Sequence, residues 1–297
     1  MKTPLKRFTL LLAGLSVLGG FTSAFAQADF YLQTNQANNS QHWNLVGSAA
    51  GWYDAATDGS QATAMDSNAV YDSNGFDIRS QDAVTDIFGG KTLILNGSAM
   101  ILKGQSGRIS QIAHLISQGT TSVRNGDTGT MRFTIGDWET SGTTSFTSGD
   151  GRNLTLAIGA LSGNGTFNFF ADNLPTNTYN LDITNGSAFT GEFLFTQGTL
   201  ALVNDLTLGG ALTLTNNSRV NLTHSITVDS LVIDGVTLAA DTYDFDYLTT
   251  HYGSIFTAGS EEFGHITVGA AIPEPSSVAL LLGGLVWGFT PLLRRRR

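Results

Sequence analysis

The sequence predicts an all-β protein whose body is a parallel β-helix, a solenoid of stacked coils. Short runs of alternating apolar and polar residues, separated by Gly, Asn and Asp, fill the chain between its two ends, and helical periodicity is nearly absent. One stretch also repeats its apolar pattern about every 20 residues, which suits a coil with three short strands. An antiparallel β-sandwich is the alternative, because it would show the same alternation.

Residues 1–26 are typical of a secretory signal peptide. A basic start precedes a short, Gly-containing apolar stretch, and Ala24 and Ala26 form the small-x-small site that a signal peptidase cleaves. We therefore expect export by the Sec machinery and cleavage between Ala26 and Gln27. A retained N-terminal anchor is the alternative, although the apolar stretch is short for a membrane span.

The charge distribution makes the region between the two ends strongly acidic. All 24 Asp and Glu lie in residues 27–275, together with only eight of the 15 Lys and Arg. Such a region would repel phosphate groups, so no nucleic-acid partner is expected. The chain contains no cysteine, which excludes disulfides, Cys-bound zinc and a cysteine nucleophile.

Residues 27–75 are expected to form an N-terminal cap. The segment lacks regular alternation and is rich in aromatic residues, among them Trp43 and Trp52. A solenoid needs such a cover over the apolar end of its first coil. The alternative is a sugar-binding platform, in which Trp43 and Trp52 would stack on pyranose rings.

Residues 76–271 are expected to form the solenoid body. Between residues 198 and 238, apolar doublets with one residue between their members would each place two side chains on one face of a short strand. Three pairs of doublets begin 20, 20 and 19 positions apart: Leu200 and Val220, Leu206 and Ile226, Leu212 and Leu231. We predict that these six residues point inward and that each pair stacks in parallel in neighbouring coils.

Weaker alternation predicts further strands upstream, at 93–95, 100–102, 131–135, 154–158, 167–169, 181–183 and 193–195. The best helical candidate is the segment 109–118, although a pair of strands fits it equally well. Segments 161–167 and 189–200 resemble the autotransporter-associated β-strand repeats of bacterial surface proteins. That resemblance covers about residues 75–270 and implies a right-handed parallel β-helix.

Acidic residues are the candidate chemistry of the body, because the histidines are scattered and no hydrolase serine motif occurs. Asp244 and Asp246 alternate with aromatic residues, so a strand there would place both carboxylates on one face. Such a pair could bind Ca²⁺ or serve a glycoside hydrolase, and the alternative is a solvated acidic face over a buried aromatic face. We expect no catalytic residues and no cofactor, with Ca²⁺ as the one candidate ion.

Residues 272–297 combine a Pro-Glu-Pro motif, an apolar run of 16 residues and a basic end. The apolar run is near the lower limit for a membrane-spanning helix. The basic end would stay in the cytoplasm and place the body on the outer side of the membrane. The motif is formed by Pro273, Glu274 and Pro275, and the basic end by Arg294, Arg295, Arg296 and Arg297.

This arrangement resembles the PEP-CTERM sorting signal of Gram-negative bacteria. The resemblance implies an inner-membrane precursor, processing by an exosortase near the motif, and display at the cell surface or release into the extracellular matrix, often together with extracellular polysaccharide. An ordinary C-terminal anchor is the alternative. The expected function is that of an exported structural or interaction protein, and the alternatives are a carbohydrate-binding module or a β-helix carbohydrate-active enzyme.

Overall fold

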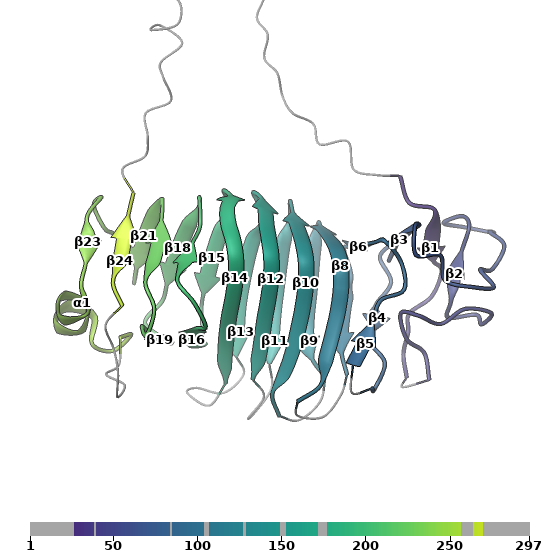
Figure 1. The fold of residues 1–297 in the computed structure, drawn as a ribbon, viewed down its shortest axis with the longest axis horizontal. Coiled ribbons are helices and arrows are strands. Elements are labelled where there is room, and N and C mark those ends of the chain that lie inside the picture. Colours follow the sequence, from purple (N-terminus) through teal and green to yellow (C-terminus); the bar gives the residue numbers. More distant parts are fainter. Residues whose placement is uncertain are drawn as a thin grey trace, which may run out of the picture.

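The computed structural model describes residues 27–38, 40–83, 85–103, 107–126, 129–148, 153–171, 177–256 and 264–269. These residues form a parallel β-solenoid of about six turns, whose strands stack along the long axis of the molecule (Figure 1). The predicted signal peptide and the predicted sorting segment with its membrane helix lie outside the described residues. Within the described ranges, no helix is both long enough and apolar enough to cross a membrane.

Two long sheets form most of the wall of the solenoid, and a third sheet is confined to its C-terminal coils. The first sheet contains, in spatial order, β19 (Ser218–Asn221), β16 (Gly198–Leu202), β14 (Thr178–Phe189), β12 (Leu154–Gly163), β10 (Met131–Thr140), β8 (Ile109–Gln118), β6 (Thr92–Asn96), β3 (Val70–Asp72), β1 (Phe30–Leu32) and β2 (Trp52–Tyr53), with β5 (Thr85–Ile87) paired to β8. The second contains β22 (Val236–Thr237), β21 (Ser230–Ile233), β18 (Ala211–Leu214), β15 (Glu192–Phe195), β13 (Thr166–Ala171), β11 (Thr143–Ser148), β9 (Thr120–Asn125), β7 (Ala99–Leu102) and β4 (Ile78–Arg79). The third contains β17 (Leu206–Thr207), β20 (Ile226–Val228), β24 (Ile266–Val268) and β23 (Thr242–Tyr243).

The strand register in the last coils confirms the predicted repeat. The observed parallel partners are Leu200 and Val220, Leu206 and Ile226, and Leu212 and Leu231. All six side chains are at most 2% exposed, so they point into the core as predicted. Parallel pairing between successive coils excludes the antiparallel sandwich.

The predicted upstream strands are also present in the structure: 93–95 in β6, 100–102 in β7, 131–135 in β10, 154–158 in β12, 167–169 in β13, 181–183 in β14 and 193–195 in β15. Their coils are longer than the 20-residue repeat. Met131, for example, pairs with Leu154, 23 positions later.

The extra length lies in long strands that turn a corner. In β10, Gly136 and Asp137 are both exposed between the buried Ile135 and Trp138, so the inward-outward alternation shifts by one residue. A side chain at position 136 would overlap the backbone carbonyl of Ala113 in the neighbouring strand, which explains the glycine at this corner. Each long strand therefore supplies two faces of the coil.

The same corner explains why the helical candidate was wrong. Residues 109–118 form a single ten-residue strand, β8. Ser110 and Ile112 point inward before the corner, and Leu115 and Ser117 point inward after it. Two alternating runs joined by a two-residue corner place apolar residues three or four apart, which is also the spacing of an amphipathic helix.

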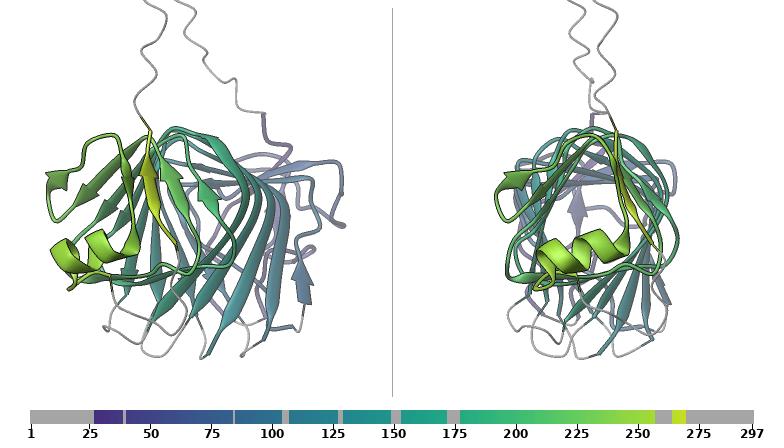
Figure 2. Two further views of the ribbon diagram at one scale, coloured as in Figure 1. Left: turned by 60° about the vertical axis from the view of Figure 1, so that its left-hand side comes forward. Right: turned by 90° about the vertical axis from the view of Figure 1, so that its left-hand side faces the viewer.

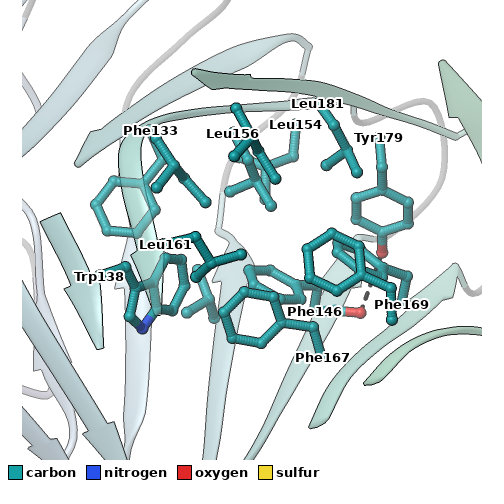
Figure 3. Close-up of a cluster of buried hydrophobic side chains, with 14 of the residues drawn as sticks. Phe133, Trp138, Phe146, Leu154, Leu156, Leu161, Phe167, Phe169, Tyr179 and Leu181 are labelled. Carbon is teal, nitrogen blue, oxygen red and sulfur yellow. Dashed lines mark hydrogen bonds between the residues drawn. The ribbon is translucent and has the colours of Figure 1, made fainter. Parts of the chain in front are cut away.

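Aromatic rings fill the core of the middle coils (Figure 3). Phe169 of β13 stacks on Phe146 of β11 with ring centroids 4.7 Å apart, and on Phe195 of β15 at 4.2 Å. These three rings occupy paired positions of consecutive strands, so the stack follows the register of the sheet. Tyr179 donates a hydrogen bond from its hydroxyl to the Phe146 carbonyl oxygen at 3.1 Å, which satisfies its polar end inside the core.

Antiparallel pairs and one helix close the ends of the stack. At the N-terminal end, β2 pairs antiparallel with β1. At the C-terminal end, β22 pairs antiparallel with β21, and β23 with β24. Helix α1 (Phe245–Tyr252) lies at this end, as the end-on view of Figure 2 shows. Its Leu248 side chain is fully buried.

Candidate functional site

Trp43 and Trp52 belong to the core of the N-terminal end. Both side chains are 0% exposed, and the Trp52 indole donates a hydrogen bond to the Trp43 carbonyl oxygen at 2.7 Å. Trp52 packs edge-on against Tyr71, with ring centroids 5.0 Å apart, and both indoles pack edge-on against Phe88. Neither ring has a free face, so the suggested sugar contact at these two residues does not fit this fold.

A buried carboxylate lies beside these rings. Asp86 of β5 is 4% exposed and accepts hydrogen bonds from the Gln81 backbone amide at 2.5 Å and from the Asn44 side chain at 3.4 Å. Burial raises the pKa of Asp86, although the Trp43 indole, the Gln81 amide and the charge of His42 act in the opposite direction. No sequence motif marks Asp86, because its surroundings come from three separate segments.

Ser110 is the partner of Asp86 in the ladder between β5 and β8. Its hydroxyl is buried, as is Nδ1 of His42, and neither atom has a hydrogen-bond partner among the described residues. The cluster therefore joins the N-terminal segment 42–44 to the first long strand through a carboxylate surrounded by incompletely bonded polar groups.

The predicted strand around Asp244 and Asp246 is wrong, because these residues begin helix α1. Asp244 is the N-cap, and its carboxylate accepts a hydrogen bond from the Tyr247 backbone amide at 2.7 Å. Asp246 lies in the first turn, where a negative charge stabilises a helix. No group of three or more His, Asp or Glu within the described ranges could hold a metal ion. Asp is a preferred N-cap residue, so Asp244 was the feature of the sequence that could have indicated the start of a helix here.

An aromatic stripe runs from the end of β23 along α1. It consists of Tyr243, Tyr247 and His251, which are spaced four residues apart. The ring centroids of Tyr243 and Tyr247 are 5.2 Å apart, and those of Tyr247 and His251 are 4.1 Å apart and stacked. Tyr247 is 38% exposed, and His251 donates a hydrogen bond from Nδ1 to the Tyr247 carbonyl oxygen at 2.8 Å. The rings thus pack against one another, and Tyr247 and His251 remain in part exposed to solvent.

The outer faces of the long sheets present small polar side chains. On the second sheet, Thr120, Thr143 and Thr166 occupy paired positions of three successive strands. On the first sheet, Arg132 of β10 reaches across β12 to Asp182 of β14, with 2.7 Å between Nη2 and Oδ2. These faces offer hydroxyl and charged groups at the regular spacing of the strands.

Most of the predicted processing residues lie outside the described residues. Ala24 and Ala26 precede the described residues, whereas Gln27 is the first of them and is exposed. Pro273, Glu274 and Pro275 and the four terminal arginines follow the last described residue. The fold and the surfaces above are therefore the observations that bear on function.

No protein-family model matches the chain, and neither a curated protein nor a solved structure matches it.

Proposed function

We propose that this protein is an exported structural and interaction protein, displayed at the surface of a Gram-negative bacterium or released into its extracellular matrix. One observation carries the proposal: a predicted signal peptide and a predicted sorting segment flank a solenoid whose outer faces are polar and whose ends are closed. Such a body offers long, rigid surfaces for contact with hydrated partners. We propose no catalytic role. We also propose that the β-helix is right-handed, because parallel β-connections prefer that hand.

The proposed route follows from the two termini. The Sec machinery exports the chain, and signal peptidase cleaves between Ala26 and Gln27. The segment 272–297 then holds the precursor in the inner membrane with the body facing outward. An exosortase recognises Pro273-Glu274-Pro275 and separates the body from the membrane segment. The two prolines keep this motif extended, which makes its backbone accessible to a protease.

Two variants test this route in a host that contains an exosortase. Glu274→Ala should leave membrane insertion intact but block release, so that the full-length precursor accumulates in membranes. Neutral residues in place of the four terminal arginines should instead disturb retention and orientation. Mass spectrometry of the extracellular protein should find no peptide beyond about residue 277. Recovery of intact residues 278–297 on the mature surface protein would show that the tail is a plain anchor.

A second candidate is a carbohydrate-binding module. The observation that favours it is the exposed ring of Phe170 on β13, which is 40% exposed, because aromatic side chains pack on the C–H faces of sugar rings. This candidate is compatible with the first, since a matrix protein can bind polysaccharide.

A further inference from the structure

We propose that the side chain of Asn44 seals an open edge of β5, and that without this seal the edge pairs with the β5 edge of a second copy of the chain. The seal is an intramolecular contact on a surface that another strand would otherwise use. This inference concerns self-association and is independent of the proposed function.

Strand β5 has a strand partner on one side. Among the described strands it pairs only with β8, at the N-terminal end of the long strands (Figure 1). On that side, the Phe88 backbone amide donates a hydrogen bond to the Gln111 carbonyl oxygen at 2.9 Å. Successive residues of a strand point their backbone groups to opposite sides, so those of Ile87 and Gly89 face away from β8. An edge of this kind pairs readily with another chain.

Asn44 bonds to the outward side of β5 as a neighbouring strand would. Its Nδ2 donates a hydrogen bond to the Ile87 carbonyl oxygen at 2.7 Å, and its Oδ1 accepts one from the Gly89 backbone amide at 2.8 Å. A residue of a neighbouring parallel strand bonds to the same two groups, a carbonyl and an amide two residues apart. One side-chain amide, which carries both a donor and an acceptor, therefore replaces a peptide unit at this edge.

The surroundings of Asn44 fix the orientation of this amide. Its Nδ2 lies 3.4 Å from Oδ1 of Asp86, which is 4% exposed. That oxygen is an acceptor, so it favours the N–H side of the amide and leaves the amide oxygen to Gly89. The preceding residue is also held, because the Trp43 backbone amide donates to the Arg79 carbonyl oxygen at 2.8 Å. The seal is thus a fixed part of the N-terminal end.

A second copy of the chain is the occupant that fits this edge. Ile87 is 56% exposed, more than any other large apolar side chain among the described residues. Two β5 edges related by a two-fold axis would pair antiparallel and bring two Ile87 side chains together, which gives a closed dimer from one surface. Asp82 and Arg108 beside the edge form an ion pair at 3.6 Å, so their opposite charges would not repel a like copy.

Light scattering coupled to size exclusion tests the seal, with the full chain in one detergent for all variants. Asn44→Ala removes both edge bonds, so its molar mass should rise with concentration towards twice that of the parent protein. Adding Ile87→Lys should restore the parent mass, because a lysine on an edge strand opposes pairing. Asn68→Ala, which removes an exposed amide from the same end, is the matched control and should behave like the parent protein.

Cross-linking locates the contact. The chain has no cysteine, so one introduced thiol reports on its own position. Thr85→Cys, at an exposed position of β5, should be linked to a dimer by a short bis-maleimide when Asn44→Ala is also present, and not otherwise. Val203→Cys, at a position that is 47% exposed elsewhere on the body, should show no such gain.

Four outcomes would overturn the inference: a folded Asn44→Ala that keeps the parent mass, association that persists with Ile87→Lys, equal association of Asn68→Ala, or an equal gain of cross-linking at position 203. Should Asn44→Ala not fold, hydrogen exchange of the parent protein decides. Slow exchange of the Gly89 amide supports the seal, and exchange as fast as that of an open strand edge overturns it.

Discussion

Leu206 lies in the stacked core, 2% exposed, beside its partner Ile226. Leu206→Asp should lower the free energy of unfolding by about 3–5 kcal/mol, because it buries a charge without a partner. Urea unfolding followed by circular dichroism measures this change. Val203→Asp is the control, since Val203 is 47% exposed and the same substitution there should change stability by at most about 0.5 kcal/mol. Similar losses for both variants would show that Leu206 is not a core residue.

Asp86 gives the N-terminal end a defined pH dependence. Burial raises its pKa in the folded state, so the folded protein binds this proton more tightly than the unfolded chain does. Its contribution to stability is therefore complete at low pH and is lost as the pH rises from the unfolded pKa through the folded pKa. Asp86→Asn should remove this loss, so that the variant gains stability relative to the parent protein between acid and neutral pH.

Unfolding free energies of Asp86→Asn and the parent protein, measured across this pH range, test the prediction. Asp137→Asn is the matched control, because Asp137 is exposed on the outside of β10. A difference between Asp86→Asn and the parent protein that stays constant with pH would contradict the assignment.

The connections between the first and second sheets contain a stack of glycines. A side chain at Gly165 would overlap the carbonyl oxygen of Gly142, and one at Gly142 would overlap that of Gly119. Gly165→Ala should therefore push two coils apart and cost about 1–3 kcal/mol, the usual effect of overpacking. Thermal unfolding measures it. Gly269→Ala is the control, because a side chain there would meet its nearest neighbour at 3.6 Å, an ordinary contact distance.

The predictable elements are those in which inward residues alternate without interruption. The last coils have short strands and a constant offset, so Leu206 and Ile226 could be paired from the sequence alone. The corner at Gly136 could not be anticipated, because it depends on how closely β10 approaches Ala113 of β8. Helix α1 was missed because alternation over a segment of a few residues does not distinguish a strand from a helix.

The candidate site was predicted in part. The sequence marked Asp244 and Asp246, but it placed the neighbouring tyrosines on a buried face. In the structure Tyr247 is exposed beside His251, since helical rotation brings residues four apart onto one side. The Asp86 cluster gave no sequence signal, because folding brings residues 42–44 to the side of β5.

At the scale of the whole molecule, the closed ends should keep the solenoid from pairing end to end. Leu248 anchors α1 over the last coil and is fully buried. Leu248→Asp should release the helix and expose the apolar end of the stack, so that the protein self-associates as its concentration rises. Light scattering coupled to size exclusion measures this. Tyr247→Asp, at an exposed position of the same helix, should keep the solution molar mass of the parent protein. Self-association of both variants would argue against a role of α1 as a cover.

The number of coils also sets a distance. Neighbouring strands in a sheet lie about 4.8 Å apart, so the parallel strands of the second sheet from β4 to β21 span roughly 35 Å. Strands β1 and β24, next to the first and last described residues, lie near opposite ends of this axis (Figure 1). Duplication of one 23-residue coil would therefore lengthen the spacing by one rung and leave both end covers unchanged. In this architecture the distance between the two ends of the body is set by the number of coils that the sequence encodes.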